Sequence, residues 1–251
     1  MSEEFKDWFS ARSIDYSAFR PDYPHAMIKW LVDQSPRRDL AFDGATGSGQ
    51  TARALAPFFK RVVASDASSS QIDNAAPCEG VEYRVARCEA SGLDDHSVDL
   101  LTIAQAAHWL DMEAFNKEVA RVMKKEGIVA IWCYQLLRTN TGIDALIDEL
   151  FADILGDKYW PPERALVEQG YQSLAFPFEE VTAPNFDMCA SWSLDHLIGY
   201  LGTWSAVQRY KDDRGEDPVA RIGSRLQAAW EKGDPVKQMS WPVSMRAGRC
   251  V

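Results

Sequence analysis

Short apolar runs alternate with amphipathic stretches along the first half of the chain. The apolar runs predict strands over residues 40–42, 61–65, 81–85, 98–104 and 128–133. Apolar positions at helical spacing predict helices over residues 24–34, 51–59, 70–76 and 115–123. Gly127 follows the last of these helices in the position of a C-terminal cap. Strands that alternate with helices in this way indicate βαβ units, so we expect an α/β fold with a mostly parallel sheet and helices on both faces.

The second half of the chain is less regular. An apolar stripe over 143–155 predicts one amphipathic helix, which Pro161 and Pro162 bring to an end. The remaining pattern predicts an extended segment over 176–188, helices over 194–210 and 218–230, and a last strand over 239–247. No linker-like stretch separates the halves, so we predict a single domain with a helical cap. Its expected parts are an N-terminal arm over 1–38, a core over 39–134, and cap helices with the final strands over 135–251.

Composition narrows the partners that such a domain can take. The net charge is −10, and an acidic protein repels phosphate backbones, so a small-molecule substrate is expected and nucleic acid is not. Five cysteines without a Cys-x-x-Cys pair indicate neither a zinc site nor a disulfide framework, so no metal is expected. The acidic N-terminus has no apolar signal core, and no stretch approaches the ~20 apolar residues that span a bilayer. These features predict a cytoplasmic protein with no membrane contact.

A glycine-rich turn follows the first predicted strand and leads into a helix, with the sequence Asp43-Gly44-Ala45-Thr46-Gly47-Ser48-Gly49. Glycines in such a turn let a ligand approach the backbone closely. The turn has neither the G-x-G-x-x-G spacing of dinucleotide sites nor the Gly-Lys-Ser/Thr of phosphate-binding loops. A carboxylate at Asp43 would repel a pyrophosphate and attract the ammonium group of a methionine moiety. These features favour S-adenosylmethionine (SAM) over NAD or a nucleotide.

Asp66 closes the second predicted strand, 23 residues after Asp43. A carboxylate at that place in this fold class accepts hydrogen bonds from the ribose hydroxyls of an adenosine. The alternative is a helix N-cap, because three serines follow at 68–70 and the next segment is helical. The spacing from the glycine turn favours ribose binding, although NAD sites share this feature.

The order of these blocks resembles the class I SAM-dependent methyltransferases, and within them the methyltransferase type 11 family. The turn at 43–49 is similar to the family's first motif, Asp66-Ala67-Ser68 is similar to its second, and Cys88-Glu89 falls where the family contacts adenine. Further similarity covers residues 16–21, 105–111, 121–127, 159–162 and 203–206. The resemblance implies a Rossmann-like seven-stranded sheet with an antiparallel last strand, and SAM across the ends of strands one to four. Trans-aconitate methyltransferase-like proteins are among the relatives.

The resemblance also implies which residues contact the cofactor. These are Tyr16, Arg20, Asp43, Gly44, Ala45, Gly47, Gly49, Gln50, Asp66, Ala67, Cys88, Glu89 and Gln105. Arg20 lies on an N-terminal arm that folds over the cofactor in the family, where a bidentate contact with the SAM carboxylate is expected. Ala45 departs from the family, which has a glycine there. If the backbone at Ala45 needs φ > 0, the Cβ atom costs roughly 1–2 kcal/mol.

His108 is the titratable residue expected closest to the reaction, because it follows the strand over 98–104 at the mouth where the methyl group should lie. With an ordinary pKa of about 6.5, its imidazole suits a general base. The alternative is a wall residue that packs against the cofactor and hydrogen-bonds to the backbone. The substrate pocket is expected to include Tyr23, Trp109, Trp160 and Trp204.

Together these features predict an enzyme of class EC 2.1.1.- that transfers a methyl group from SAM to a small-molecule O, N or C nucleophile, leaving S-adenosylhomocysteine as the product. The cofactor supplies the electrophile, and the protein supplies position and electrostatics. One alternative is a non-catalytic SAM-binding protein of the same fold. A NAD-dependent oxidoreductase is a second alternative, which Asp43 and the spacing of the turn disfavour.

Overall fold

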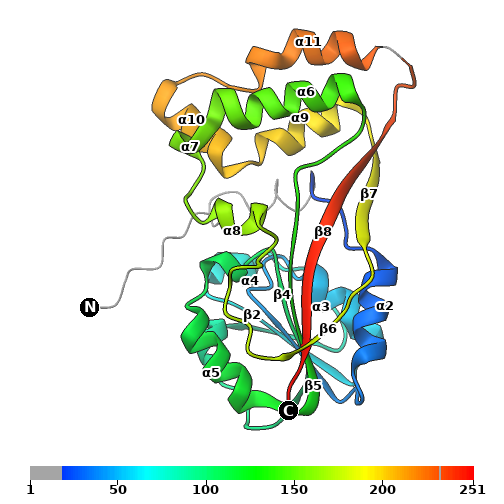
Figure 1. Ribbon diagram of the computed structural model, residues 1–251, viewed down its shortest axis with the longest axis vertical. Coiled ribbons are helices and arrows are strands. Elements are labelled where there is room, and N and C mark those ends of the chain that lie inside the picture. Colours follow the sequence, from blue (N-terminus) through cyan, green and yellow to red (C-terminus); the bar gives the residue numbers. More distant parts are fainter. Residues whose placement is uncertain (1–18, 232) are drawn as a thin grey trace.

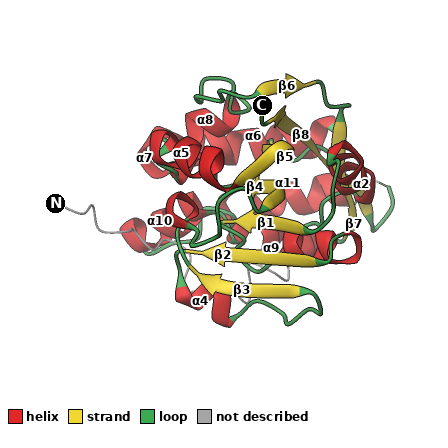
Figure 2. Cartoon of the chain, turned by 90° about the horizontal axis from the view of Figure 1, so that it is seen from below, coloured by secondary structure: helices red, strands yellow, loops and turns green. Residues whose placement is uncertain are grey.

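The computed structural model describes residues 19–231 and 233–251, and its centre is an eight-stranded sheet (Figures 1 and 2). Strands neighbour one another in the order β3-β2-β1-β4-β5-β8-β6, and β7 also pairs with β8. The strands are β1 (Leu40–Gly44), β2 (Arg61–Asp66), β3 (Val81–Val85), β4 (Val98–Ala104), β5 (Met123–Tyr134), β6 (Glu179–Val181), β7 (Phe186–Trp192) and β8 (Lys237–Arg249). Strands β1 to β5 pair in parallel, and β8 runs antiparallel to its neighbours. The predicted Rossmann-like fold is therefore confirmed.

The expected seven-stranded path is confirmed, and an eighth strand, β7, pairs with β8 outside that path. The C-terminal part of β8, from Val243 on, pairs with β5, and its last residues also pair with β6. Its N-terminal part, up to Val243, pairs with β7 instead. The β7–β8 ribbon thus leaves the sheet and runs up to the cap helices, as the yellow and red strands in Figure 1 show.

Helices cover both faces of the sheet because residues along the central strands alternate between two apolar clusters. Leu100 and Ile128 pack with α2 (His25–Gln34) and α3 (Gln50–Leu55) on one face. Leu101 and Val129 pack with α5 (Met112–Val122) on the other. A short helix, α4 (Ser69–Asp73), lies against β2 and β3 at the edge of the sheet.

The predicted end of the helix before β5 at Gly127 is wrong. Helix α5 ends at Val122, and β5 begins at the next residue and includes Gly127. A Cβ atom at Gly127 would lie 2.7 Å from the Cε atom of Met123 and 2.9 Å from the carbonyl oxygen of Lys124. The glycine is therefore required by close packing. The polar residues 124–126 at the start of β5 have the pattern of an exposed helix surface, so the sequence predicted helix where the structure has strand.

The second half of the chain adds a cap of helices beyond one end of the sheet (Figure 1). Its elements are α6 (Thr141–Asp148), a π-helical stretch over Glu149–Leu155, α7 (Gly156–Tyr159), α9 (Leu194–Gly202), α10 (Ser205–Arg214) and α11 (Ala220–Trp230). The single helix predicted over 194–210 is two helices, which meet at Thr203 and Trp204. These elements share one apolar cluster that contains Trp192 and Trp241. A further helix, α8 (Arg164–Glu168), lies between the cap and the sheet.

The helices of the described part of the chain are too short or too polar to cross a lipid bilayer.

Candidate cofactor site and acceptor cavity

The turn after β1 adopts the left-handed backbone that its glycines allow. The φ angles are +50° at Ala45, +55° at Gly47 and +82° at Gly49. Gly49 is also the N-cap of α3, and a Cβ atom there would lie 2.5 Å from the Tyr83 hydroxyl oxygen. Glycine is therefore required at Gly49 for both conformation and space. Ala45 stands where the family has a glycine, and it carries its Cβ atom at a positive φ angle, which is strained for a residue other than glycine.

Asp43 lies beneath this turn and is buried, with only 1% of the residue exposed. Its Oδ2 atom accepts hydrogen bonds from the Thr46 hydroxyl and from the backbone N–H of Ala52, and its Oδ1 atom accepts one from the Thr102 hydroxyl at 2.8 Å. Burial raises the pKa of Asp43 from 3.8 to about 6, because water no longer solvates the charged form. These contacts make Asp43 the anchor of the turn. Attraction of the methionine ammonium remains a prediction.

Asp66 lies at the carboxyl end of β2 and reaches the same turn. Its Oδ2 atom accepts a hydrogen bond from the backbone N–H of Gly47 at 2.9 Å, and its Oδ1 atom accepts one from Ser68 at 2.9 Å. The N-cap of α4 is Ser68, whose hydroxyl accepts from Gln71. The alternative in which Asp66 caps this helix is therefore wrong. A carboxylate can accept several hydrogen bonds, as the binding of ribose hydroxyls would require.

Cys88 and Glu89 follow β3 in a short helical turn over Cys88–Ala90. Cys88 is buried against Gly44, where a Cβ atom would lie 2.8 Å from the cysteine sulfur. Burial raises the pKa of the Cys88 thiol, so this group is an inert part of the floor. Glu89 is half-buried and accepts a hydrogen bond from the backbone N–H of Asp111 at 3.2 Å.

These residues fit SAM. The turn presents backbone in a conformation that leaves no room for a side chain at Gly49, and a carboxylate stands at the end of the next strand. Gln50 opens α3 beside the turn, and Ala67 follows Asp66. Both lie at the carboxyl edge of the parallel strands, where ligands bind in open α/β sheets.

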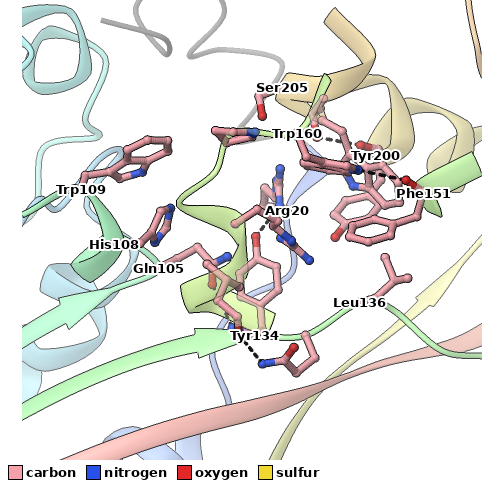
Figure 3. A pocket seen from close by; sticks show the side chains of 16 residues that line it. Arg20, Gln105, His108, Trp109, Tyr134, Leu136, Phe151, Trp160, Tyr200 and Ser205 are labelled. Atoms are coloured by element: carbon pink, nitrogen blue, oxygen red, sulfur yellow. Dashed lines mark hydrogen bonds between the residues drawn. The ribbon is translucent and has the colours of Figure 1, made fainter. Parts of the chain in front are cut away.

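A cavity of about 100 Å³ adjoins this edge between β4, β5 and the cap (Figure 3). Six of its sixteen lining residues are aromatic: Trp109, Tyr134, Phe151, Trp160, Tyr200 and Trp204. Two are arginines, Arg20 and Arg164, and no aspartate or glutamate lines the cavity in the described part of the chain. The wall is therefore apolar with positive charge.

Gln105 joins the strand end to the cavity. Its φ angle is +54°, a conformation that costs a non-glycine residue of order 1–3 kcal/mol. The strain is held in place from two sides, because the Gln105 N–H donates to the Trp132 carbonyl at 2.8 Å and its Oε1 atom accepts from the Tyr134 N–H at 2.8 Å. Strained backbone of this kind clusters at ligand sites.

His108 lines the cavity from the short helix Ala107–Trp109. Its Nδ1 atom lies 2.7 Å from the hydroxyl oxygen of Tyr171, a fully buried residue in the segment after α8. Loss of water around the ring lowers the pKa of His108 to about 3, and the positive charge of Arg164 acts in the same direction. The imidazole is therefore neutral at physiological pH, and a pKa near 6.5 is not retained.

The two arginines of the cavity are held against aromatic rings. The Arg20 guanidinium lies 5.0 Å from the centre of the Tyr200 ring and donates a hydrogen bond to the Tyr134 hydroxyl (Figure 3). The Arg164 guanidinium lies 5.1 Å from the rings of both Phe151 and Trp160, and its Nε atom lies 3.6 Å from the carboxylate of Glu168, which is not a lining residue. Contacts with aromatic rings orient a guanidinium. Contact of Arg20 with the SAM carboxylate remains a prediction.

The structure brings together Trp109, Trp160 and Trp204 on the cavity wall, as expected for a substrate pocket. Tyr23, also expected there, is absent from the lining and packs edge-on against Trp132, at 5.4 Å between ring centres. It contacts both the core on the α2 face and the apolar cluster of the cap. Tyr16 lies outside the described residues.

Sequence reasoning missed several residues of this site, among them Arg164, Tyr134 and Tyr171. Tyr171 lies 63 positions from its partner His108, and no local pattern marks it. Arg164 follows the break at Pro161 and Pro162, where the sequence predicts only the end of a helix.

Comparisons with known proteins agree with this geometry. A family model described as a methyltransferase domain (type 11) matches residues 42–131. A proposed methyltransferase of Dictyostelium discoideum is 34% identical over 249 residues, with 96% of this chain and 94% of that protein covered. An uncharacterized methyltransferase of Schizosaccharomyces pombe is 34% identical over 231 residues, with 85% of each chain covered.

A solved structure gives the same result. A proposed type II methyltransferase from Anaeromyxobacter dehalogenans superposes with a TM-score of 0.86 and 42% identity, over 92% of this chain and 97% of that one. The predicted family and cofactor are thereby confirmed. The chain therefore belongs to the type 11 family of SAM-dependent methyltransferases, in agreement with the glycine turn after β1 and the carboxylate at the end of β2.

Proposed function

We propose that this methyltransferase acts on a small molecule that sits in the aromatic cavity and presents an O, N or C nucleophile. The observation that carries the proposal is the position of Gln105 and His108. Both belong to the carboxyl end of β4, the edge at which the cofactor motifs lie, and both line the cavity. An acceptor in the cavity is therefore next to the cofactor edge of the sheet.

SAM, when bound, supplies an electrophilic methyl group on a positively charged sulfur. The protein's part is to bind, orient and exclude water. Asp66, with the turn that it holds, would bind the adenosine, and Arg20 would bind the methionine end. The aromatic rings of the cavity would hold the acceptor in line with the methyl group and keep bulk water out.

The charge of the cavity restricts the chemical class of the acceptor molecule. Arg20 and Arg164 both line it, and no acidic side chain of the described residues does. A cationic acceptor would be repelled, whereas a neutral or anionic polar group on an apolar body would be attracted. The net charge of −10 further disfavours nucleic acid.

The test is an assay with labelled SAM and a cell extract that is fractionated into protein, nucleic acid and small metabolites. We expect label in a compound of low molecular mass with an apolar body and a neutral or acidic group. The matched control is Asp66→Ala, which should lose labelling. Binding of SAM by calorimetry without transfer to any fraction would instead support the non-catalytic alternative. Label in protein or nucleic acid would contradict the small-molecule assignment.

A further inference from the structure

We infer that Tyr171 fixes His108 as the neutral tautomer with its proton on Nε2, so that His108 donates a hydrogen bond to the acceptor molecule and does not remove a proton from it. The role in acceptor binding rests on the proposed function, whereas the tautomer does not. Tyr171 is a positioning residue in this scheme.

The tautomer follows from the hydrogen bonds at the Tyr171 hydroxyl. Tyr171 is fully buried, and the partner of its hydroxyl among the described residues is His108 Nδ1 at 2.7 Å. The hydroxyl has a single proton, and a buried O–H group without an acceptor costs about 1–3 kcal/mol. Tyr171 must therefore donate to Nδ1, which then has no proton of its own. A neutral imidazole without a proton on Nδ1 carries it on Nε2.

Tyr171 is held firmly enough to impose this choice. The residue is fully buried and has a φ angle of +63°, which is strained for a tyrosine. Its backbone N–H donates to the Leu166 carbonyl at 2.9 Å, and its carbonyl accepts from the Arg246 guanidinium at 3.1 Å. The ring also stacks on the imidazole, with 5.9 Å between centres and 29° between planes.

The surroundings of His108 oppose the charged imidazolium. Among the described residues, the charged and titratable groups that face it are Arg164 on α8, then Arg20, Tyr134 and Tyr200 across the cavity, and Tyr171. None of these is an acid that would stabilise a positive ring. Because Nδ1 is bound to Tyr171, the edge that carries Nε2 is the one available to the cavity that His108 lines.

A fixed donor restricts the acceptor chemistry. His108 can hold an acceptor oxygen through the Nε2–H group, but it cannot take a proton near neutral pH. The attacking atom must therefore carry an available lone pair beforehand, as an ionised oxygen does. Its lone pair forms the new bond to the methyl carbon, the S–CH3 bond breaks with its electron pair left on sulfur, and no proton moves. The cationic wall of the cavity suits such an acceptor.

The tautomer can be tested without turnover. The chain has four histidines, so selective ¹⁵N labelling gives few signals, and His108→Gln identifies those of His108. Long-range ¹H–¹⁵N correlation spectra separate protonated from unprotonated ring nitrogens. We expect an unprotonated Nδ1 and a protonated Nε2 that stay unchanged between about pH 5 and pH 8, where a free histidine titrates. A proton on Nδ1, or conversion to the imidazolium within that range, would overturn the inference.

Tyr171→Phe keeps the buried ring and removes the hydroxyl. We expect it to release the tautomer, seen as averaged ring-nitrogen signals, and to raise the acceptor KM or lower kcat by about tenfold, the usual effect of one lost hydrogen bond. The matched control is Tyr210→Phe, which removes a buried hydroxyl bonded to Glu216 away from the cavity. Unchanged His108 signals in Tyr171→Phe would contradict the positioning role.

Two replacements of His108 separate a donor from a base. Glutamine can place an N–H near the Nε2 position, whereas asparagine is too short to do so. A donor role predicts that His108→Gln keeps much more activity than His108→Asn, with a rate that stays flat with pH. A base role predicts that both variants lose about 10²–10⁴ in rate, because neither amide accepts a proton. Equal and large losses would refute the donor role even if the spectra confirmed the tautomer.

Discussion

The carboxylate of Asp66 accepts a hydrogen bond from the backbone N–H of Gly47 at 2.9 Å, which ties the end of β2 to the turn after β1. The same carboxylate holds the backbone of Ser68. Asp66 therefore shapes the cofactor turn even before any ligand is present. A change at Asp66 removes both a proposed ligand contact and a support of the turn.

Asp66→Ala should weaken SAM binding by more than tenfold, since hydrogen bonds to a charged group contribute about 1.5–3 kcal/mol each. Calorimetric titration with SAM measures this effect. The control is Asp33→Ala, which removes an exposed carboxylate on α2 that pairs with Lys29. A Kd equal to that of the unchanged protein would show that Asp66 serves the turn alone.

Ala45 and Gly47 have nearly equal φ angles, +50° and +55°, so opposite replacements at the two positions can be compared. Ala45→Gly should relieve roughly 1–2 kcal/mol of strain, partly offset by about 0.4–1 kcal/mol from the freer unfolded chain. SAM affinity should hold or improve. Gly47→Ala should destabilise the protein. Urea unfolding and SAM titration measure both variants, and a clear loss of affinity in Ala45→Gly would contradict the strain argument.

Asp43 should make the stability of the protein fall as the pH rises. Burial raises its pKa from 3.8 to about 6, so its contribution is full below the unfolded value and is lost as the pH passes through about 6. A difference of this size corresponds to up to about 3 kcal/mol. The amide side chain in the variant Asp43→Asn cannot ionise, so the variant does not lose this contribution. The free energy of unfolding of Asp43→Asn should therefore rise relative to that of the unchanged protein as the pH increases from about 4 to about 7.5. Parallel curves in urea unfolding would show that Asp43 ionises without penalty.

Arg164→Gln should separate acceptor binding from cofactor binding. The variant keeps much of the side-chain length but removes the charge that lies against Phe151 and Trp160. For an anionic acceptor, KM should rise about tenfold or more, while the Kd of SAM stays the same. Arg225→Gln is the control, because its partner Glu149 lies on the cap outside the cavity. An unchanged KM for every labelled acceptor would argue against a cationic wall.

Much of the core was predictable because a strand buried on both faces has a simple sequence pattern. Residues 81–85 and 98–104 form β3 and β4 with the expected limits. The start of β5 was missed because Lys124, Lys125 and Glu126 carry no apolar signal. Trp109, Trp160 and Trp204, which were expected in the cavity wall, line the cavity.

The partners within the site were not predictable, since they depend on contacts between distant segments. The pKa of His108 is lowered by the loss of water around the ring and by the charge of Arg164, and local sequence reveals neither. The aromatic ring of Tyr23 fits a pocket and a core equally well by residue type alone. In the structure this ring packs against Trp132 and does not line the cavity.

The ladder between β7 and β8 bears on how such enzymes can diverge. It joins Phe186–Trp192 to the first half of β8, whose second half belongs to the central sheet. The cap is thus attached through main-chain hydrogen bonds, which form regardless of side-chain identity. Replacements on the cavity wall can therefore alter acceptor choice while the cap keeps its place, so new specificities can arise on an unchanged frame.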